Sequence, residues 1–269
     1  MHKLPVWMLV VGLLVSGCAS SPVGGGNGGP TSAGGSSTVP VTSTSAPAPS
    51  ALDDLTPFVT AAARLDRAVA AAADLVNGGI GTTVLHADRA TVAAVEALDP
   101  ATVAATIPVG LSPALLRAVL LVDSDLVSRT ASLHGFTRVF TGDQDTFPVP
   151  QPGQPETEMT MALACLRNGA TAAARFSTDL AAVRALASAA PPVVTAAPAS
   201  RSAEELAALL DYVGLANTGC ASCGGTRLTE LPAIRWETGP GAVVGSIGGI
   251  AFEARYTAAT GWTVLLHAC

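Results

Sequence analysis

The sequence predicts an α+β fold in which an alanine-rich antiparallel helical bundle precedes a small C-terminal antiparallel β-sheet. In residues 51–217 apolar side chains recur every three to four positions, the spacing of one helical face, and in residues 218–269 the period changes to two. The composition is 49% hydrophobic but only 4% aromatic. The core is therefore built mainly of Ala, Val and Leu, and alanine-rich helices pack closely as bundles.

The N-terminal segment combines a basic start at Lys3, an apolar run over residues 6–15 and the sequence Val15-Ser16-Gly17-Cys18. This pattern resembles the lipobox of bacterial lipoprotein precursors. The resemblance implies that residues 1–17 are a signal peptide and that Cys18 is diacylated and becomes the N-terminus when the signal peptide is cleaved. The apolar run is too short to span a hydrocarbon core of about 30 Å. We expect an extracytoplasmic protein anchored to the cell membrane by its lipid; the alternative is an ordinary secretory signal in which Cys18 is incidental.

Residues 18–50 are dominated by Gly, Ser, Thr and Pro, a composition that buries too little apolar surface to offset the entropy of ordering. We predict a flexible tether between the lipid and the folded domain. The formal net charge of −6 argues against nucleic acid as a partner. Lys3 is the single lysine, so loss of the signal peptide would also exclude Schiff-base and phosphate-loop lysine chemistry.

The first helix is predicted through residues 55–76, with Ser50 and Asp53 as a capping box and Asn77-Gly78 as its end. Shorter helices are expected at residues 88–98 and after Asp99-Pro100. The predicted buried face of the first helix consists of Leu55, Phe58, Ala62, Leu65, Val69, Ala72 and Val76.

Three further helices complete the predicted bundle. Ser112-Pro113 begins one that runs to Gly135, with an apolar face of Leu115, Val119, Val122, Leu126 and Leu133. Pro155 precedes another, which ends at Pro191-Pro192 and presents Met159, Leu163, Leu166, Ala170, Ala173, Phe176, Leu180, Val183 and Leu186. Ser202 with Glu205 is predicted to cap the last, which carries Leu206, Leu209 and Val213.

The C-terminal region is predicted to form strands at residues 234–237, 242–249 and 250–256, followed by a loop over residues 257–261 and a last strand beginning at Trp262. Alternation is clearest where Ile250, Phe252, Ala254 and Tyr256 share one face. Such a sheet is too small to be stable alone, so we expect it to pack on the bundle.

Four cysteines remain after Cys18: Cys165, Cys220, Cys223 and Cys269. An even number in an oxidising compartment predicts two disulfides. Closing longer loops stabilises more in the chain-entropy model, which favours Cys165 pairing with Cys220 or Cys223 and Cys269 pairing with the other. The alternatives are a dithiol redox pair at Cys220 and Cys223 and a zinc site formed by these two with His267 and Cys269.

For function, the sequence favours binding of a small ligand or an envelope protein over catalysis. Aromatic residues beside arginines are enriched at recognition surfaces, and Trp236, Arg235, Tyr256 and Trp262 gather where the helical and strand periods meet. The alternative is that both tryptophans only fill the core between bundle and sheet. We predict no catalytic residue, no metal site and no cofactor, and the alternative function is an envelope enzyme that exchanges thiols and disulfides at Cys220 and Cys223.

Two pairs of carboxylates, Asp123 with Asp125 and Asp143 with Asp145, lack the glycine and terminal glutamate of an EF-hand. We expect both pairs to lie on solvated turns or helix faces.

Overall fold

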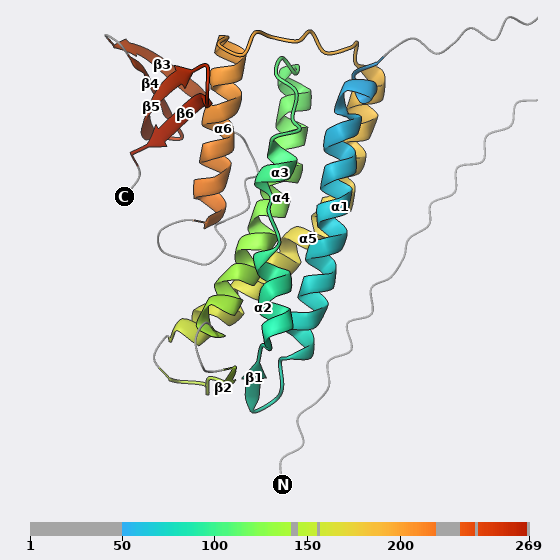
Figure 1. The fold of residues 1–269 in the computed structure, drawn as a ribbon, viewed down its shortest axis with the longest axis vertical. Coiled ribbons are helices and arrows are strands. Elements are labelled where there is room, and N and C mark those ends of the chain that lie inside the picture. The colour runs from blue at the N-terminus through green and yellow to red at the C-terminus, as the bar shows by residue number, and fades with distance from the viewer. Residues whose placement is uncertain (1–49, 141–144, 155–156, 219–231, 240–241, 268–269) are drawn as a thin grey trace, which may run out of the picture. The chain divides into compact units, whose positions relative to one another are not determined.

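A computed structural model of the protein describes residues 50–140, 145–154, 157–218, 232–239 and 242–267. The contacts divide the chain into two units, and the first, Met1–Ala46, lies outside the described residues. In the second, helices come first and a four-stranded antiparallel sheet comes last, which confirms the α+β prediction (Figure 1). Among the described helices, none combines the length and the hydropathy that a membrane-spanning segment requires.

The first helix, α1 (Ala51–Gly78), forms as its periodicity predicts. The backbone N–H of Ser50 donates to the Asp53 carboxylate at 3.4 Å, one arm of the predicted capping box. Pro57 lies at the seventh position of α1, where its ring nitrogen cannot donate the intrahelical hydrogen bond to the carbonyl of Asp53. Every residue of the predicted apolar face is buried.

Short elements connect α1 to the next long helix. The helix α2 (Arg89–Glu96) begins at Asp88, whose carboxylate accepts a hydrogen bond from the Thr91 N–H at 2.7 Å. The helix α3 (Ala101–Ala104) follows Pro100 as expected. A two-stranded pairing of β1 (Val84–His86) with β2 (Thr146–Pro148) was not predicted, because strands this short show no clear alternation.

The most extensive contact in the helical region is made by α4 (Pro113–Thr137), which packs along α5 (Glu158–Ala189); α4 also contacts α1 (Figure 1). Ser112 caps α4, since its hydroxyl accepts from the Leu115 N–H at 3.5 Å. The helix runs past the predicted Gly135 and is continued by a single 3-10 turn, Arg138–Phe140.

The predicted face of α5 is wrong between Met159, which is buried as predicted, and Phe176. The buried positions there are small residues one place earlier than the leucines: Ala162, Cys165, Gly169 and Ala172. A Cβ added at Gly169 would lie 2.9 Å from the Ser132 Cβ of α4, so the helices approach too closely for larger side chains. Leu163 and Leu166 pack at the margins of this contact instead. In the second half Phe176, Leu180 and Val183 are buried as predicted, whereas Leu186 is exposed and Ala187 is buried instead.

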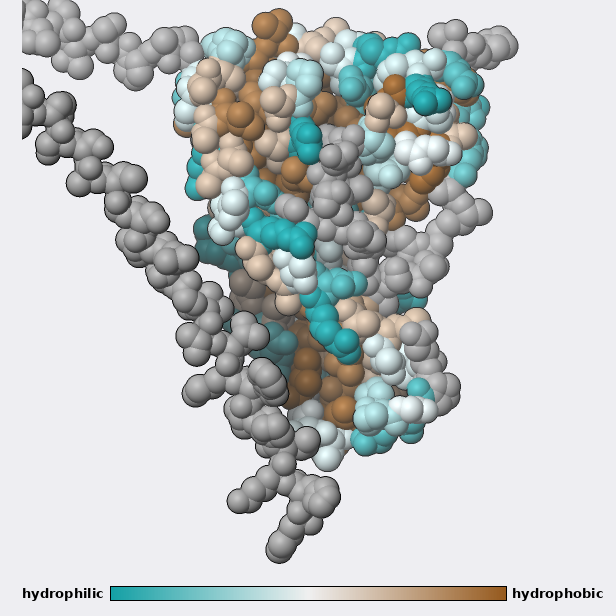
Figure 2. Space-filling model, turned by 180° about the vertical axis from the view of Figure 1, so that it is seen from behind, coloured by the Kyte–Doolittle hydropathy of each residue, from teal (hydrophilic) through white to brown (hydrophobic). Residues whose placement is uncertain are grey.

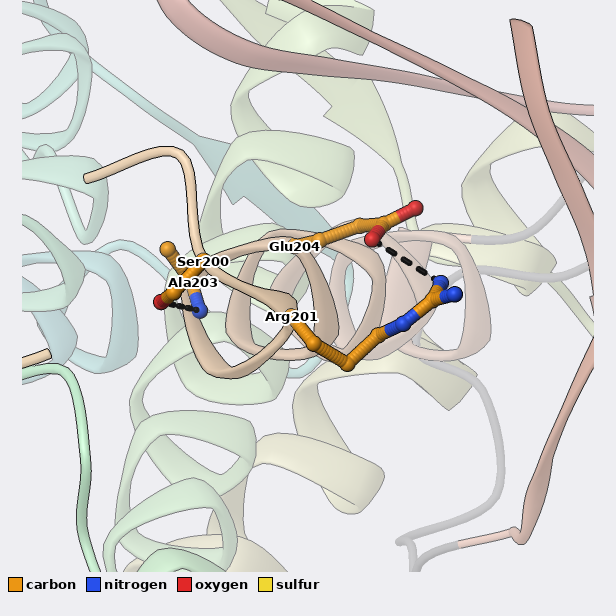
Figure 3. Close-up of polar contacts among 4 residues, drawn as sticks. All are labelled: Ser200, Arg201, Ala203 and Glu204. Atoms are coloured by element: carbon orange, nitrogen blue, oxygen red, sulfur yellow. Dashed lines mark hydrogen bonds and ion pairs between the residues drawn. The ribbon is translucent and has the colours of Figure 1, made fainter. Parts of the chain in front are cut away.

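The last helix, α6 (Arg201–Thr218), starts two residues earlier than predicted. Ser200 is the cap rather than Ser202, since its hydroxyl accepts from the Ala203 N–H at 3.3 Å (Figure 3). In the first turn Glu204, rather than Glu205, forms the polar contact, and its carboxylate pairs with Arg201 at 2.9 Å. The predicted apolar residues Leu206, Leu209 and Val213 are buried.

The sheet is a meander of β3 (Ile234–Gly239), β4 (Ala242–Ile247), β5 (Ile250–Thr257) and β6 (Gly261–Leu266), all antiparallel. Gly248 and Gly249 make the two-residue turn between β4 and β5 with φ of 56° and 83°, a backbone conformation that favours glycine. Ile247, Phe252 and Ala254 are buried, and the sheet contacts α6. The prediction that the sheet packs on the helices is therefore confirmed through α6.

One hydrophobic cluster joins the helices to the sheet. Large apolar side chains also remain exposed, and Figure 2 shows patches of apolar surface interspersed with polar ones. The exposed large apolar residues are Leu75, Ile80, Val84, Met161, Leu186, Val194, Tyr256 and Leu265.

Candidate functional site

A cleft of about 560 Å³ opens where the helices meet the sheet. We call it the seam cleft. Its walls come from α3, α4, α6 and β6, because α6 contacts both α4 and β6. Positions 207, 210, 211 and 214 of α6 share one helical face, as do positions 123 and 127 of α4. The lining residues are Pro100, Ala101, Ala104, Asp123, Val127, Ala207, Leu210, Asp211, Gly214, Trp262, Thr263 and Val264.

Asp123 is the most deeply placed polar group in this lining. Its side chain belongs to α4 and the residue is 2% exposed. Its Oδ1 atom has no hydrogen-bond partner among the described residues. Burial raises the pKa of Asp123 to about 7, because a carboxylate removed from water is stabilised less than a neutral carboxyl. A carboxyl group that faces a cleft and titrates near neutrality is a candidate functional group.

Asp211, Trp262 and Thr263 are the other residues of the lining that carry polar side-chain atoms. Asp211 is exposed and lies on α6, and partial burial raises the pKa of its carboxyl. Trp262 of β6 is half-buried, and its indole Nε1 is buried without a hydrogen-bond partner among the described residues. Tyr256 packs against the Trp262 ring at a centroid distance of 5.4 Å. The lining thus carries two carboxyl groups, one hydroxyl and the aromatic ring of Trp262, whose indole N–H is buried.

A buried amide fixes the spacing of α4 and α6 beside the cleft. The Asn217 side chain is fully buried and its Nδ2 donates to the Ser124 hydroxyl at 2.9 Å and to the Val213 carbonyl at 2.8 Å. Ser124 follows Asp123 directly, so this bond holds the segment of α4 that carries the carboxyl against α6. Replacing either partner would leave a buried polar group unsatisfied.

The interpretation of Asp123 and Asp125 as residues of a solvated helix face is wrong. Both are buried, at 2% and 0% exposure. The misinterpretation arose because α4 is packed on several sides, so one apolar stripe does not define its buried surface. Asp145 is exposed as expected and lies 3.7 Å from the His86 ring nitrogen, whereas Asp143 lies outside the described residues.

The structure divides the four residues predicted to bind at this junction. Trp262 and Tyr256 are cross-strand neighbours on β6 and β5, and only Trp262 lines the cleft. Trp236 packs edge-on against Phe252 at 5.4 Å, and Arg235 is exposed on β3. Both tryptophans are half-buried against the hydrophobic cluster, so each also contributes to packing between sheet and helices.

A second contact ties the start of α6 to the sheet. The Arg201 guanidinium lies over the Trp236 ring, 4.1 Å from its centroid, and pairs with Glu204 (Figure 3). Burial raises the pKa of the Glu204 carboxyl, and the Arg201 charge opposes this shift. The arrangement has its own counterion and holds β3 against α6, so it is a structural contact.

A third polar group lies on a different face of α4. Arg129 is buried, forms an ion pair with Asp66 of α1 and lies 5.6 Å from the ring centroid of Phe176 of α5. A cavity of about 110 Å³ adjoins it. This buried charge, unlike that of Asp123, has a counterion.

Of the predicted cysteine sites, Cys165 alone lies within the described residues. It is fully buried in α5, with its Sγ atom 3.0 Å from the Met161 carbonyl oxygen. Cys18, Cys220, Cys223 and Cys269 lie outside the described residues, so lipidation, both disulfides, the dithiol alternative and the zinc alternative stay predictions. In the part of the chain that the structure describes, no group of three or more His, Cys, Asp or Glu side chains is placed to hold a metal ion.

Comparisons of the chain with protein-family models, with curated proteins and with solved structures found no match. The functional assignment therefore rests on the sequence and on the geometry of the seam cleft.

The sequence analysis missed Asp123 and Asp211 as site residues. One signal was present: the run Asp123-Ser124-Asp125 interrupts an otherwise apolar segment between Val122 and Leu126. Three polar residues inside such a segment indicate either an exposed face or a buried polar site. Only the position of α6 beside α4 distinguishes these two cases.

Proposed function

We propose that this protein is a lipid-anchored, extracytoplasmic bacterial protein that binds a small ligand in the seam cleft. One observation supports the binding function above all others. Asp123 is a buried carboxyl group whose Oδ1 atom has no described hydrogen-bond partner, and it lines a cleft of a volume typical of small-molecule sites. Burying such a group without a partner costs free energy, and a ligand that supplies a donor removes the cost.

A catalytic function has one feature in its favour, the pKa of Asp123 near 7. Acid–base or nucleophilic catalysis also needs a second reactive group within hydrogen-bond reach. The described lining contains no histidine, cysteine or serine, and its other titratable side chain is Asp211. We therefore propose binding, and thiol–disulfide exchange at Cys220 and Cys223 remains the alternative function.

The binding function is tested by closing the cleft. Gly214 lines the cleft, and a Cβ added there would meet no atom of another element within 4 Å, so a side chain at this position extends into open space. We expect a mixed fragment library, screened by ligand-observed NMR, to give binders that Gly214→Leu abolishes and Gly214→Ala retains. Binders that are unaffected by Gly214→Leu, or a library without binders, would contradict the proposal.

The anchor is proposed from the resemblance of residues 15–18 to a lipobox. Two or more acyl chains bind a protein durably to a membrane. We expect the full chain to partition into the detergent phase and Cys18→Ala to abolish this partitioning and leave the chain without lipid mass. An unchanged mass and partitioning in Cys18→Ala would show that Cys18 is not the anchor.

A further inference from the structure

We infer that the ligand of the seam cleft is a small organic cation, a primary ammonium group on an apolar body, with the ammonium held by Asp123 and Asp211. This inference rests on the proposed binding function and specifies its ligand class. It follows from the charge of the lining, from two unpartnered buried atoms and from the apolar walls.

The charge of the lining is of one sign. Asp123 and Asp211 are its only titratable side chains among the described residues, and none of the lining residues is basic. The guanidinium of Arg201, at the start of α6, is not part of the lining and is engaged with Glu204 and Trp236. Two carboxylates in one cleft favour a cation over an anion, and partial exclusion of water strengthens that preference.

The buried atoms specify the chemistry further. An ionised carboxylate only accepts hydrogen bonds, and Asp123 Oδ1 has no donor among the described residues. A primary ammonium group supplies three N–H donors together with the opposite charge, and such charge-assisted hydrogen bonds are the stronger kind. The buried Trp262 Nε1 is a donor without a described acceptor, which a neutral oxygen on the same ligand would satisfy.

The remaining walls fit a hydrocarbon body. Ala101 and Ala104 of α3 leave space, and Val127, Leu210 and Val264 present apolar side chains from three other elements. The face of the Trp262 ring adds an aromatic surface, which attracts both hydrocarbon and cations. A ligand with one charged end and an apolar remainder matches this distribution.

The test compares three probes that share a benzyl body and differ in the charge of the head group: 2-phenylethylamine, 2-phenylethanol and phenylacetate. Binding to the purified full-length protein is measured by calorimetry at pH 8, where the amine is protonated and Asp123 is mostly ionised. We expect the amine to bind at least tenfold more tightly than the alcohol and phenylacetate to show no binding.

Isosteric variants then locate the cation. Asp123→Asn is expected to weaken the amine at least tenfold and to leave the alcohol within twofold. Asp211→Asn, at an exposed position, is expected to weaken the amine by twofold to fivefold. Asp74→Asn, an exposed residue of α1 outside the cleft lining, is the matched control for net charge and is expected to have no effect.

The outcomes separate this inference from the binding function. If the alcohol or phenylacetate bound as tightly as the amine or more tightly, the inference that the ligand is a cation would be overturned. Absence of binding by all three probes would also overturn it. If in either case the fragment library still gives binders that Gly214→Leu abolishes, the cleft binds a ligand of another class. An amine affinity that is unchanged in both Asp123→Asn and Asp211→Asn would also overturn the inference.

Discussion

The helix α4 buries charge on two sides, and the two sides differ in how that charge is compensated. Toward α1 and α5, the Arg129 guanidinium has the Asp66 carboxylate as its counterion and Phe176 beneath it. Toward α6 and β6, the Asp123 carboxyl has no described partner at Oδ1 and faces a cleft. A compensated buried charge holds elements together, whereas an uncompensated one lowers stability unless something else binds to it.

This difference predicts an effect of pH on the Asp123 side. The carboxyl ionises near pH 7 in the folded protein and near its ordinary value of 3.8 in the unfolded chain. Between these values the folded state binds more protons, so stability is lost as pH rises through this window. At about 1.4 kcal/mol per pKa unit, the loss from this group by pH 8 is about 4 kcal/mol.

Asp123→Asn removes the ionisation and is expected to abolish this part of the pH dependence. Urea unfolding of both proteins at pH 4 and pH 8 measures it. The variant should gain stability over the wild type on going from pH 4 to pH 8, by up to about 4 kcal/mol. Parallel stability curves for the two proteins would show that Asp123 is not an uncompensated charge.

The Arg129 side is expected to respond to loss of its counterion. The Arg129 side chain is 7% exposed and the Asp66 side chain 33% exposed. Asp66→Ala leaves a buried guanidinium without a partner and should cost about 3 kcal/mol of unfolding free energy. Arg129→Met leaves a carboxylate that water can reach and should cost less. Urea unfolding of both variants measures the two losses of unfolding free energy. A larger loss in Arg129→Met than in Asp66→Ala would show that Asp66, not Arg129, is the more deeply buried partner.

Replacing two helical glycines by alanine is expected to change stability by smaller amounts and in opposite directions. A Cβ added at Gly169 of α5 would lie 2.9 Å from the Ser132 Cβ of α4, whereas a Cβ added at Gly214 of α6 would lie in open space. Alanine favours a helix over glycine by about 1 kcal/mol. Gly214→Ala should therefore stabilise by roughly 0.5 to 1 kcal/mol, and Gly169→Ala should destabilise by about 1 kcal/mol because α4 and α5 must separate. Thermal unfolding that shows the same sign for both would contradict the difference in packing.

The elements of the fold differ in how far the sequence could predict them. The buried face of α1 and the four strands follow directly from periodicity, because each of these elements has one buried side. The first half of α5 was predicted one residue out of place, since its contact with α4 is so close that Ala162, Cys165 and Gly169 fit where leucines do not. Hydrophobicity alone predicts that the leucines, rather than these smaller residues, are buried.

The site was predicted only in part for a related reason. Trp262 was identified because an aromatic residue at the change of period suggests an interface, and it lines the cleft. Asp123 was assigned to solvent because a carboxylate is seldom buried without a partner. Its burial follows from α6 and β6, which are distant in sequence and leave no local signal in α4.

The central claim is that Asp123 is a buried carboxyl group without a counterion and that it binds a cationic ligand. Titration of the Asp123 carboxyl tests this claim most directly. The lining brings one other titratable group to this cleft, Asp211 of α6, and the lining residues of α3 and β6 carry no charge. Carboxyl-carbon NMR of the wild type, with Asp123→Asn to assign the resonance, gives the pKa with and without 2-phenylethylamine. We predict a pKa near 7 in the free protein that falls by at least one unit when the amine is bound, because a cation favours the ionised form. A free-protein pKa near 4, or a pKa that the amine does not lower, would contradict the claim.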